Sequence, residues 1–328
     1  MKPSAVVALA KTHIKANIPL FLWGAPGIGK SSVIQQLAED LDRELVDIRL
    51  SQMEPVDLLG LPNIINGRTH WSTPGIFPDP DATSEGILFL DEANSAPREV
   101  LAAAYQLVLD RQLGEYKVPS GWTIILAGNR QEDHAIVTTM PAPLNNRMAH
   151  VDFDLHLEDW VAWAAKAGIR PEIISFLRFR PGELHNFSED SRAWPSPRTW
   201  EKVDAALKEA TPDIEYEVVK SLVGEGAAVE YQSFVKFYRN LPSIDTIIAN
   251  PTKVAIPKEP ASKFAIAGMI GEHMDEKNVA KVMKYVKRLP KEFQVPAIRD
   301  AVHKNDRLID DTVITDWMDD NHDIFVVS

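Results

Sequence analysis

Residues 24–31 read Gly-Ala-Pro-Gly-Ile-Gly-Lys-Ser, and this segment constrains the fold more than any other part of the chain. The pattern G-x-x-x-x-G-K-S/T is a loop whose backbone N–H groups surround phosphate oxygens. Its lysine reaches the β- and γ-phosphates, and its hydroxyl side chain ligates Mg²⁺. Such a loop lies between a strand and a helix, whose N-terminal dipole favours anions. Both neighbours are present here. Residues 19–23 form a short apolar run, and residues 31–41 repeat apolar side chains at helical spacing.

A pair of acids follows a second apolar run. Residues 86–90 read as a buried strand, and Asp91 and Glu92 come directly after it. Beside a phosphate loop, Asp91 can hold Mg²⁺ together with Ser31, and Glu92 can orient and polarise an attacking water. The residues predicted to bind the nucleotide are Gly24, Ala25, Pro26, Gly27, Ile28, Gly29, Lys30, Ser31, Ser32 and Asp91, with Ser31 and Asp91 as the metal ligands.

Three more polar residues are candidates for the same chemistry. Asn129 follows the buried strand 122–127, where its amide can position water near the γ-phosphate. Arg147 lies at a helix end, from which it can point at the nucleotide of a neighbouring subunit; such an arginine is worth about three to five powers of ten in rate. Arg198 begins a helix in the second half and can close over the nucleotide. Taken singly, Asn129 also fits a plain turn residue, and Arg198 also fits a surface arginine at a helix start.

The first half of the chain alternates strand and helix signals. This alternation predicts an α/β core at residues 1–156, with a parallel sheet covered by helices on both faces. A small hairpin is expected at residues 63–71, turning at Asn66-Gly67. The predicted strands are residues 19–23, 45–50, 86–90, 122–127 and 150–156, and the predicted N-terminal helix ends at Lys15.

From about residue 157 the periodicity is helical. We expect an all-α lid domain at residues 157–250, a proline-containing linker near residues 250–260, and three or four further helices in a C-terminal extension at residues 251–328. The extension also fits as part of the lid, and its role does not follow from the sequence.

Composition limits the classes of protein that fit. The formal net charge is −12, which argues mildly against a chain that coats nucleic acid but leaves a local basic pore open. The absence of cysteine excludes disulfides and thiolate chemistry and suits a reducing, cytoplasmic location. The apolar runs are too short for a membrane span, and the N-terminal residues resemble an amphipathic helix more than a signal peptide.

One strand carries a pattern that imitates a metal site. His150, Asp152, Asp154 and His156 alternate along it, so their side chains share one face. We interpret them as the polar face of an edge strand, because ligands on a single strand point too far apart to converge on one ion.

In this order the motifs resemble those of an AAA+ ATPase over residues 15–210. Residues 24–31 match its Walker A motif, and Asp91 with Glu92 match Walker B. Asn129 falls at the family's first sensor, Arg147 at its arginine finger and Arg198 at its second sensor, with Arg130 and Arg111 as alternatives for the finger. The segments around residues 88–94, 127–130 and 146–147 look most like the MoxR branch.

The resemblance implies a homo-oligomeric ring, usually a hexamer, that binds ATP and Mg²⁺ between subunits and remodels or chaperones a protein partner. In this branch that partner often carries a von Willebrand factor A domain. The segment Leu58-Leu59-Gly60-Leu61 lacks the aromatic residue of threading pore loops, so the hairpin with Arg68, His70 and Trp71 is the alternative pore element. Two other functions stay open: a motor linked to nucleic acid, and a nucleotide-gated scaffold with slow hydrolysis.

Overall fold

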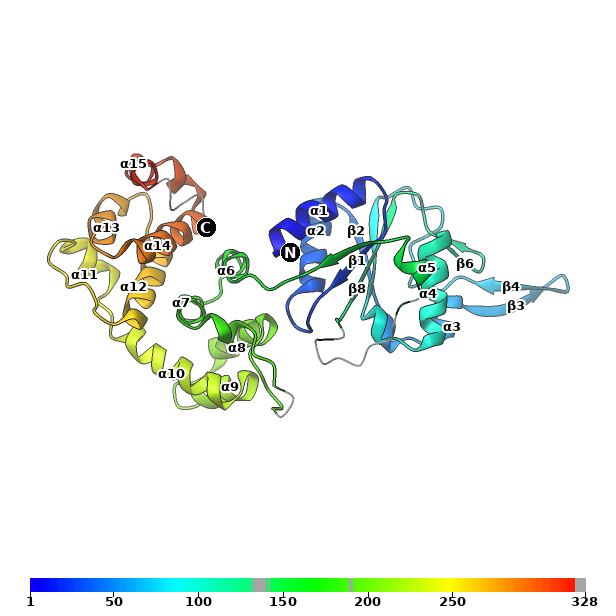
Figure 1. The fold of residues 1–328 in the computed structure, drawn as a ribbon, viewed down its shortest axis with the longest axis horizontal. Helices are drawn as coiled ribbons and strands as arrows, with labels where there is room; N and C mark the ends of the chain where they lie inside the picture. Colours follow the sequence, from blue (N-terminus) through cyan, green and yellow to red (C-terminus); the bar gives the residue numbers. More distant parts are fainter. Residues whose placement is uncertain (131, 133–139, 141, 189–190, 322–328) are drawn as a thin grey trace. The chain divides into compact units, whose positions relative to one another are not determined.

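The computed structural model describes residues 1–130, 132, 140, 142–188 and 191–321. It divides into two compact units, Met1–His156 and Leu157–Ser328. The first contains the strands of the chain's main sheet, and the second is helical (Figure 1). Within the described residues, no helix is both long and apolar enough to cross a membrane.

The first unit is built on a five-stranded sheet in which every neighbouring pair is parallel. In sheet order its strands are β2 (Glu44–Arg49), β5 (Gly86–Asp91), β8 (Trp122–Gly128), β1 (Leu20–Trp23) and β9 (Ala149–Asp152). Every residue of β5 and β8 is buried, as expected for central parallel strands covered on both faces. The predicted α/β fold class is confirmed.

Helices cover both faces of this sheet because alternate residues of each strand point to opposite sides. The helices are α1 (Pro3–Lys15), α2 (Lys30–Asp40), α3 (Pro55–Leu59), α4 (Arg98–Asp110) and α5 (Ala142–Asn145). Leu20 and Leu22 of β1 belong to a core shared with α1 and α2. Phe21, between them, belongs to a second core shared with α3, α4 and α5.

Strand β9 is shorter than the sequence predicted. The expected strand ran from His150 to His156, whereas β9 ends at Asp152. It is an edge strand, and its partner β1 ends at Trp23, directly opposite Asp152. The Phe153 N–H still donates to the Trp23 carbonyl at 2.7 Å, but the Asp154 N–H donates to the Met1 carbonyl at 2.9 Å, away from β1. The polar and apolar alternation therefore continues without strand geometry.

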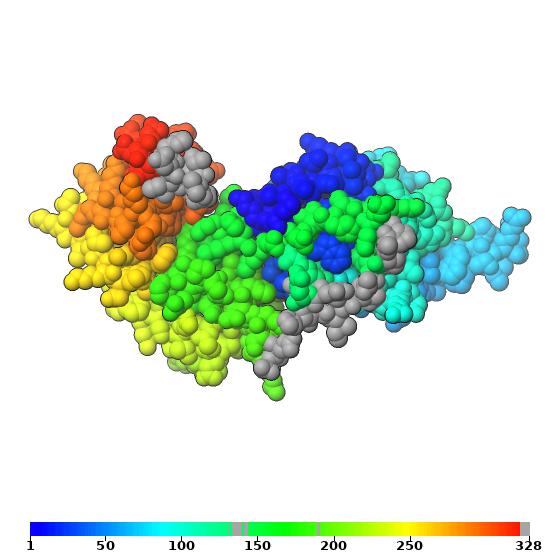
Figure 2. Space-filling model, in the orientation of Figure 1, coloured from blue at the N-terminus to red at the C-terminus, as the bar shows by residue number. Residues whose placement is uncertain are grey.

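Two hairpins extend from this unit. The predicted one is present as β3 (Leu61–Ile65) and β4 (Arg68–Ser72), with Asn66 and Gly67 both at positive φ, as a tight I′ turn requires. All five residues of β3 are exposed, and the ribbon stands out from its unit (Figures 1 and 2). The second hairpin pairs β6 (Gln112–Leu113) with β7 (Tyr116–Lys117).

The second unit consists of helices. They are α6 (Leu157–Lys166), α7 (Pro171–Phe179), α8 (Pro197–Glu209), α9 (Glu215–Val223), α10 (Glu225–Arg239), α11 (Ile244–Ala249), α12 (Pro260–His273), α13 (Val279–Val286), α14 (Lys291–Lys304) and α15 (Thr312–Asp320). The chain also forms short 3₁₀ turns at Leu50–Gln52, Ala93–Ser95, Pro181–Leu184 and Asp306–Asp310. The proline-containing segment 250–260 is not helical before Pro260, but Val254 and Ile256 pack on the core formed by α11 to α15.

A buried ion cluster joins early and late helices of the second unit. Arg178 of α7 donates from Nη2 to Asp300 Oδ1 at 2.7 Å and to Glu158 Oε2 at 3.0 Å. Arg299 donates to the same Glu158 carboxylate. Although burial alone lowers the pKa of Arg178, the charges of Asp300 and then Glu158 keep it raised. The cluster therefore connects α6 and α7 to α14, which lies in the predicted C-terminal extension.

Replacing Arg178 with Met should destabilise the second unit strongly. The variant leaves the Asp300 carboxylate, which is 10% exposed, without its cation, while Glu158 keeps Arg299. Breaking a buried pair in this way costs about 3–5 kcal/mol. Urea unfolding followed by tryptophan fluorescence measures the change. Arg180→Met is the matched control, because Arg180 pairs with Glu230 at 2.8 Å on the surface and such pairs contribute at most about 1 kcal/mol. Equal losses in the two variants would contradict this account.

Candidate functional site

The sequence-predicted residues of the first unit gather at one edge of the sheet. Gly24, Asp91 and Asn129 come directly at or after the carboxyl ends of β1, β5 and β8, and these three strands are neighbours. Ligands of open α/β sheets bind outside such strand ends. The edge also receives the N-terminus of α2, which begins at Lys30.

The phosphate loop is closed by its own lysine. Lys30 is buried, and its Nζ donates to the carbonyl oxygens of Gly24 at 2.5 Å and Ala25 at 2.9 Å. It also donates to Asn129 Oδ1 at 3.2 Å. Gly29 has a φ of 99°, a left-handed conformation that suits glycine and lets the backbone enter α2. The loop thus presents backbone N–H groups and a cation at the start of a helix, as phosphate binding requires.

Ser31 and Asp91 form the pair that fits a divalent cation. Ser31 Oγ donates to Asp91 Oδ2 at 2.6 Å. Mg²⁺ is bound through one or two carboxylates together with substrate phosphates and waters, and it prefers oxygen ligands. A hydroxyl and a carboxylate this close together, beside a phosphate loop, match that chemistry.

Glu92 has an unusual backbone and a fixed side chain. Its φ is 54°, in the left-handed region that costs a non-glycine residue about 1–3 kcal/mol unless the surroundings impose it. Its N–H donates to Asp91 Oδ1 at 2.8 Å, and its carboxylate accepts a hydrogen bond from the Ser51 hydroxyl. Partial burial and then the charge of Asp91 raise the pKa of Asp47 on the neighbouring strand β2. Negative charge is therefore concentrated here, where a bound cation would reduce it.

Asn129 is held by a residue to which sequence reasoning gave no role in the site. Asn94 Nδ2 donates to the Asn129 carbonyl at 2.7 Å, and the Asn129 N–H donates to Asn94 Oδ1 at 3.0 Å. Asn94 is 2% exposed. A Cβ at Gly128 would lie 2.3 Å from Asn94 Oδ1, so only glycine allows the amide to approach so closely. The segment 88–94 contained Asn94, but no local pattern indicated this long-range partner.

The three arginines considered for the finger differ in their surroundings. Arg147 is exposed in the turn between α5 and β9. Arg130 donates to Asp152 Oδ1 at 3.1 Å and to Asp154 Oδ1 at 2.6 Å, within its own unit. Arg111 donates to two backbone carbonyls of its unit at 2.8 and 2.7 Å. Arg130 and Arg111 thus have structural partners, whereas Arg147 is exposed to solvent.

Arg198 belongs to the second unit. It is exposed in the first turn of α8, whose start is fixed by a reciprocal cap between Ser196 and Thr199 and by the buried Trp200. Its approach to a nucleotide remains a prediction.

The histidines and aspartates of the segment 150–156 have other partners. Asp152 and Asp154 bind Arg130, and His150 accepts a hydrogen bond from Trp23. Among the residues that the structure describes, no three His, Asp or Glu side chains are arranged to hold a metal ion.

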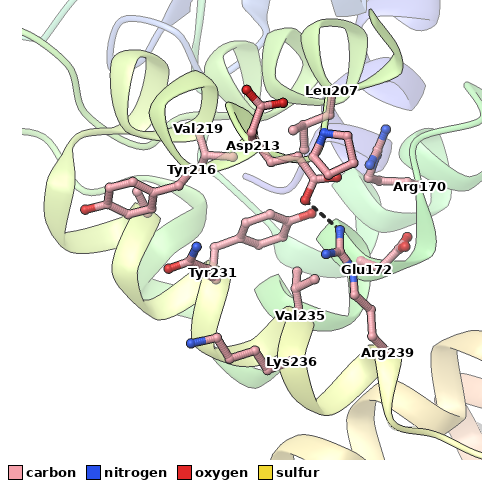
Figure 3. A pocket seen from close by; sticks show the side chains of 14 residues that line it. Arg170, Glu172, Leu207, Asp213, Tyr216, Val219, Tyr231, Val235, Lys236 and Arg239 are labelled. Carbon is pink, nitrogen blue, oxygen red and sulfur yellow. Dashed lines mark hydrogen bonds and ion pairs between the residues drawn. The ribbon is translucent and has the colours of Figure 1, made fainter. Parts of the chain in front are cut away.

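The second unit contains a pocket lined mainly by α9 and α10 (Figure 3). Tyr231 and Arg239 are among its lining residues, and Arg239 pairs with Glu215 at 2.6 Å. Arg170, also in the lining, pairs with Asp204 at 3.3 Å. Both arginines therefore already have carboxylate partners, and we assign this pocket no ligand.

Replacing Asn94 with Ala should destabilise the first unit. The variant leaves the N–H and C=O of the partly buried Asn129 without their side-chain partner, and losing such a partner costs about 1–3 kcal/mol. Urea unfolding measures the change, with the half-buried neighbour Ser95→Ala as the control. Wild-type stability in Asn94→Ala would refute the role of Asn94 in holding Asn129.

Among solved structures, a mutant RuvB from Thermotoga maritima is 14% identical, with a TM-score of 0.41 over 87% of this chain and 86% of that chain. NtrX from Brucella abortus in complex with ATP is 16% identical, with a TM-score of 0.42 over 87% of this chain and 65% of that chain. The family model described as AAA domain (dynein-related subfamily) matches residues 19–148. Over residues 19–148, this chain is similar to the AAA domains of the dynein-related subfamily.

Proposed function

We propose that the protein is a Mg²⁺- and ATP-dependent ATPase of the MoxR branch, which works in the cytoplasm as a hexameric ring and remodels a protein partner. One observation supports ATP hydrolysis above all. Lys30, the Ser31–Asp91 pair and Asn129 lie together at the ends of adjacent strands. These are the groups that ATP hydrolysis needs: a phosphate cradle, a metal-binding pair and a polar amide near the γ-phosphate.

In this proposal each side chain has one task. Lys30 leaves the loop carbonyls to bind the β- and γ-phosphates, and Ser31 and Asp91 hold Mg²⁺, which when bound neutralises charge on the phosphate oxygens. Glu92 orients and polarises the attacking water as a general base. Asn129 accepts from Lys30 through Oδ1, so its Nδ2 is the group available to position water or phosphate.

Assembly completes the site in the proposed ring. Arg147 is exposed on a turn of the AAA domain, so it is suited to reach a nucleotide bound by a neighbouring subunit. Residues 157–250 act as the lid that carries Arg198, and residues 251–328 pack with them through the Arg178 cluster.

The hairpin β3–β4 supports a protein as the partner. Ile64 is 81% exposed, Leu61 62%, Ile65 52% and Trp71 39%. Exposed apolar groups gathered in this way mark sites of interaction with other proteins. Nothing in the chain's overall charge of −12 favours a nucleic acid in their place. In the MoxR branch, the proposed partner is a protein with a von Willebrand factor A domain.

Replacing Glu92 with Gln should abolish hydrolysis while leaving ATP binding intact. The amide keeps the size of the side chain but cannot take a proton, and loss of such a base lowers the rate by about two to four powers of ten. Phosphate release and equilibrium binding of a fluorescent ATP analogue separate the two steps. Lys30→Ala is the comparison, because it should reduce binding itself. Normal turnover in Glu92→Gln would exclude the assigned base.

Replacing Arg147 with Ala should remove activity that a second inactive variant restores in trans. A transition-state arginine is worth about three to five powers of ten in rate. In a mixed assembly, Lys30→Ala subunits bind nucleotide weakly but supply an intact Arg147 to an Arg147→Ala neighbour. Phosphate release from mixtures at varied ratios measures this. Arg130→Ala is the control variant, and mixtures that stay inactive would show that Arg147 does not act between subunits.

A further inference from the structure

The turn that carries Arg147 is anchored on both sides by buried side chains. Leu144 is 1% exposed and Met148 7%, and both belong to the same apolar core as Phe21 of β1. The Arg147 N–H donates to the Leu144 carbonyl at 3.0 Å, which closes the turn. Arg147 is therefore an exposed side chain on a backbone fixed against the strand that leads into the phosphate loop.

His150 adds a directional link between the same two elements. Trp23 Nε1–H donates to His150 Nδ1 at 3.0 Å, and His150 Nε2 lies 2.8 Å from the Asn145 carbonyl. Indole N–H can only donate and a carbonyl can only accept, so the ring must accept at Nδ1 and donate from Nε2. One imidazole thus joins the residue before Gly24 to the carbonyl two residues before Arg147.

Ring packing fixes the orientation of this link. His150 lies opposite Phe21 in the β1–β9 ladder. The Trp23 and His150 rings are stacked at 24° with centroids 6.0 Å apart, and Trp23 stacks on Phe21 at 4.0 Å. His150 is exposed on the edge strand β9, and its ring is oriented by the stacking with Trp23 and by its two hydrogen bonds, which direct Nε2–H at the Asn145 carbonyl.

We propose that His150, oriented by Trp23, is a positioning residue for the Arg147 turn and couples that turn to the strand entering the phosphate loop. This inference rests on the proposed role of Arg147 and identifies what holds the arginine in place. His150 touches no reacting atom in this assignment. Its effect is on where Arg147 is presented to a neighbouring subunit.

Two amide variants separate the hydrogen bonds of the ring. In His150→Gln the side-chain amide reaches the place of Nε2 and can still donate to the Asn145 carbonyl. In His150→Asn it reaches only the place of Nδ1, so the bond to Trp23 is retained and the bond to the turn is lost. His150→Phe keeps the stacked ring and removes both bonds.

We expect His150→Asn and His150→Phe to lower kcat for ATP hydrolysis by about fivefold to tenfold, the effect of losing about one hydrogen bond or of a small misplacement of the arginine. ATP affinity, measured with a fluorescent analogue, should stay within about twofold of wild type, because the phosphate loop is intact. His150→Gln should retain most of the activity. Equal loss in His150→Gln and His150→Asn would overturn the assignment of the Nε2 bond.

Mixing His150→Asn subunits with Lys30→Ala subunits shows whether the loss of activity comes from Arg147 or from the phosphate loop. If His150 positions Arg147, the Lys30→Ala subunits supply a correctly placed arginine and restore activity to His150→Asn sites. If His150 acts on its own phosphate loop through Trp23, activity stays low and ATP affinity falls, which overturns the inference. The Arg147→Ala mixture is run in parallel. If that mixture fails to recover, the proposed role of Arg147 fails and the inference fails with it; if it alone recovers, only the inference fails.

Discussion

The pairing of β1 with β8 is the constraint on which the candidate site depends. These strands run parallel with Trp23 opposite Gly128, so the phosphate loop and Asn129 leave the sheet at the same level. The Gly24 N–H continues the ladder by donating to the Gly128 carbonyl at 3.2 Å. Lys30 can reach Asn129 only because this register brings the two loops together.

Much of the first unit could be predicted because its strands and its phosphate loop follow from patterns of neighbouring residues. The apolar runs before Gly24 and Asp91 predicted β1 and β5, and the phosphate loop predicted the start of α2. The hydrogen bonds from Asn94 to Asn129 and from Ser51 to Glu92 could not be predicted. They join residues 35 and 41 positions apart through single side chains. Such contacts follow from tertiary packing and leave no periodic trace in the sequence.

In the second unit too, contacts between residues far apart in the sequence could not be predicted. Helical periodicity indicated its helices, but it could not indicate that Arg178 meets Asp300, 122 residues further along the chain. A proline-containing segment near residue 250 suggested a boundary, and yet Val254 and Ile256 pack against the core of later helices. Composition alone does not distinguish a linker from an irregular segment that contributes to a core.

The hairpin β3–β4 has a consequence for how this protein can diverge among relatives. None of the β3 side chains is buried, so substitutions there remove little packing energy, and exposed changes usually alter stability by less than about 0.5 kcal/mol. The residues around Lys30 and Asn94 have no such freedom, because each has several partners. Selection can therefore change the exposed surface of the hairpin while the phosphate loop and its partners stay the same.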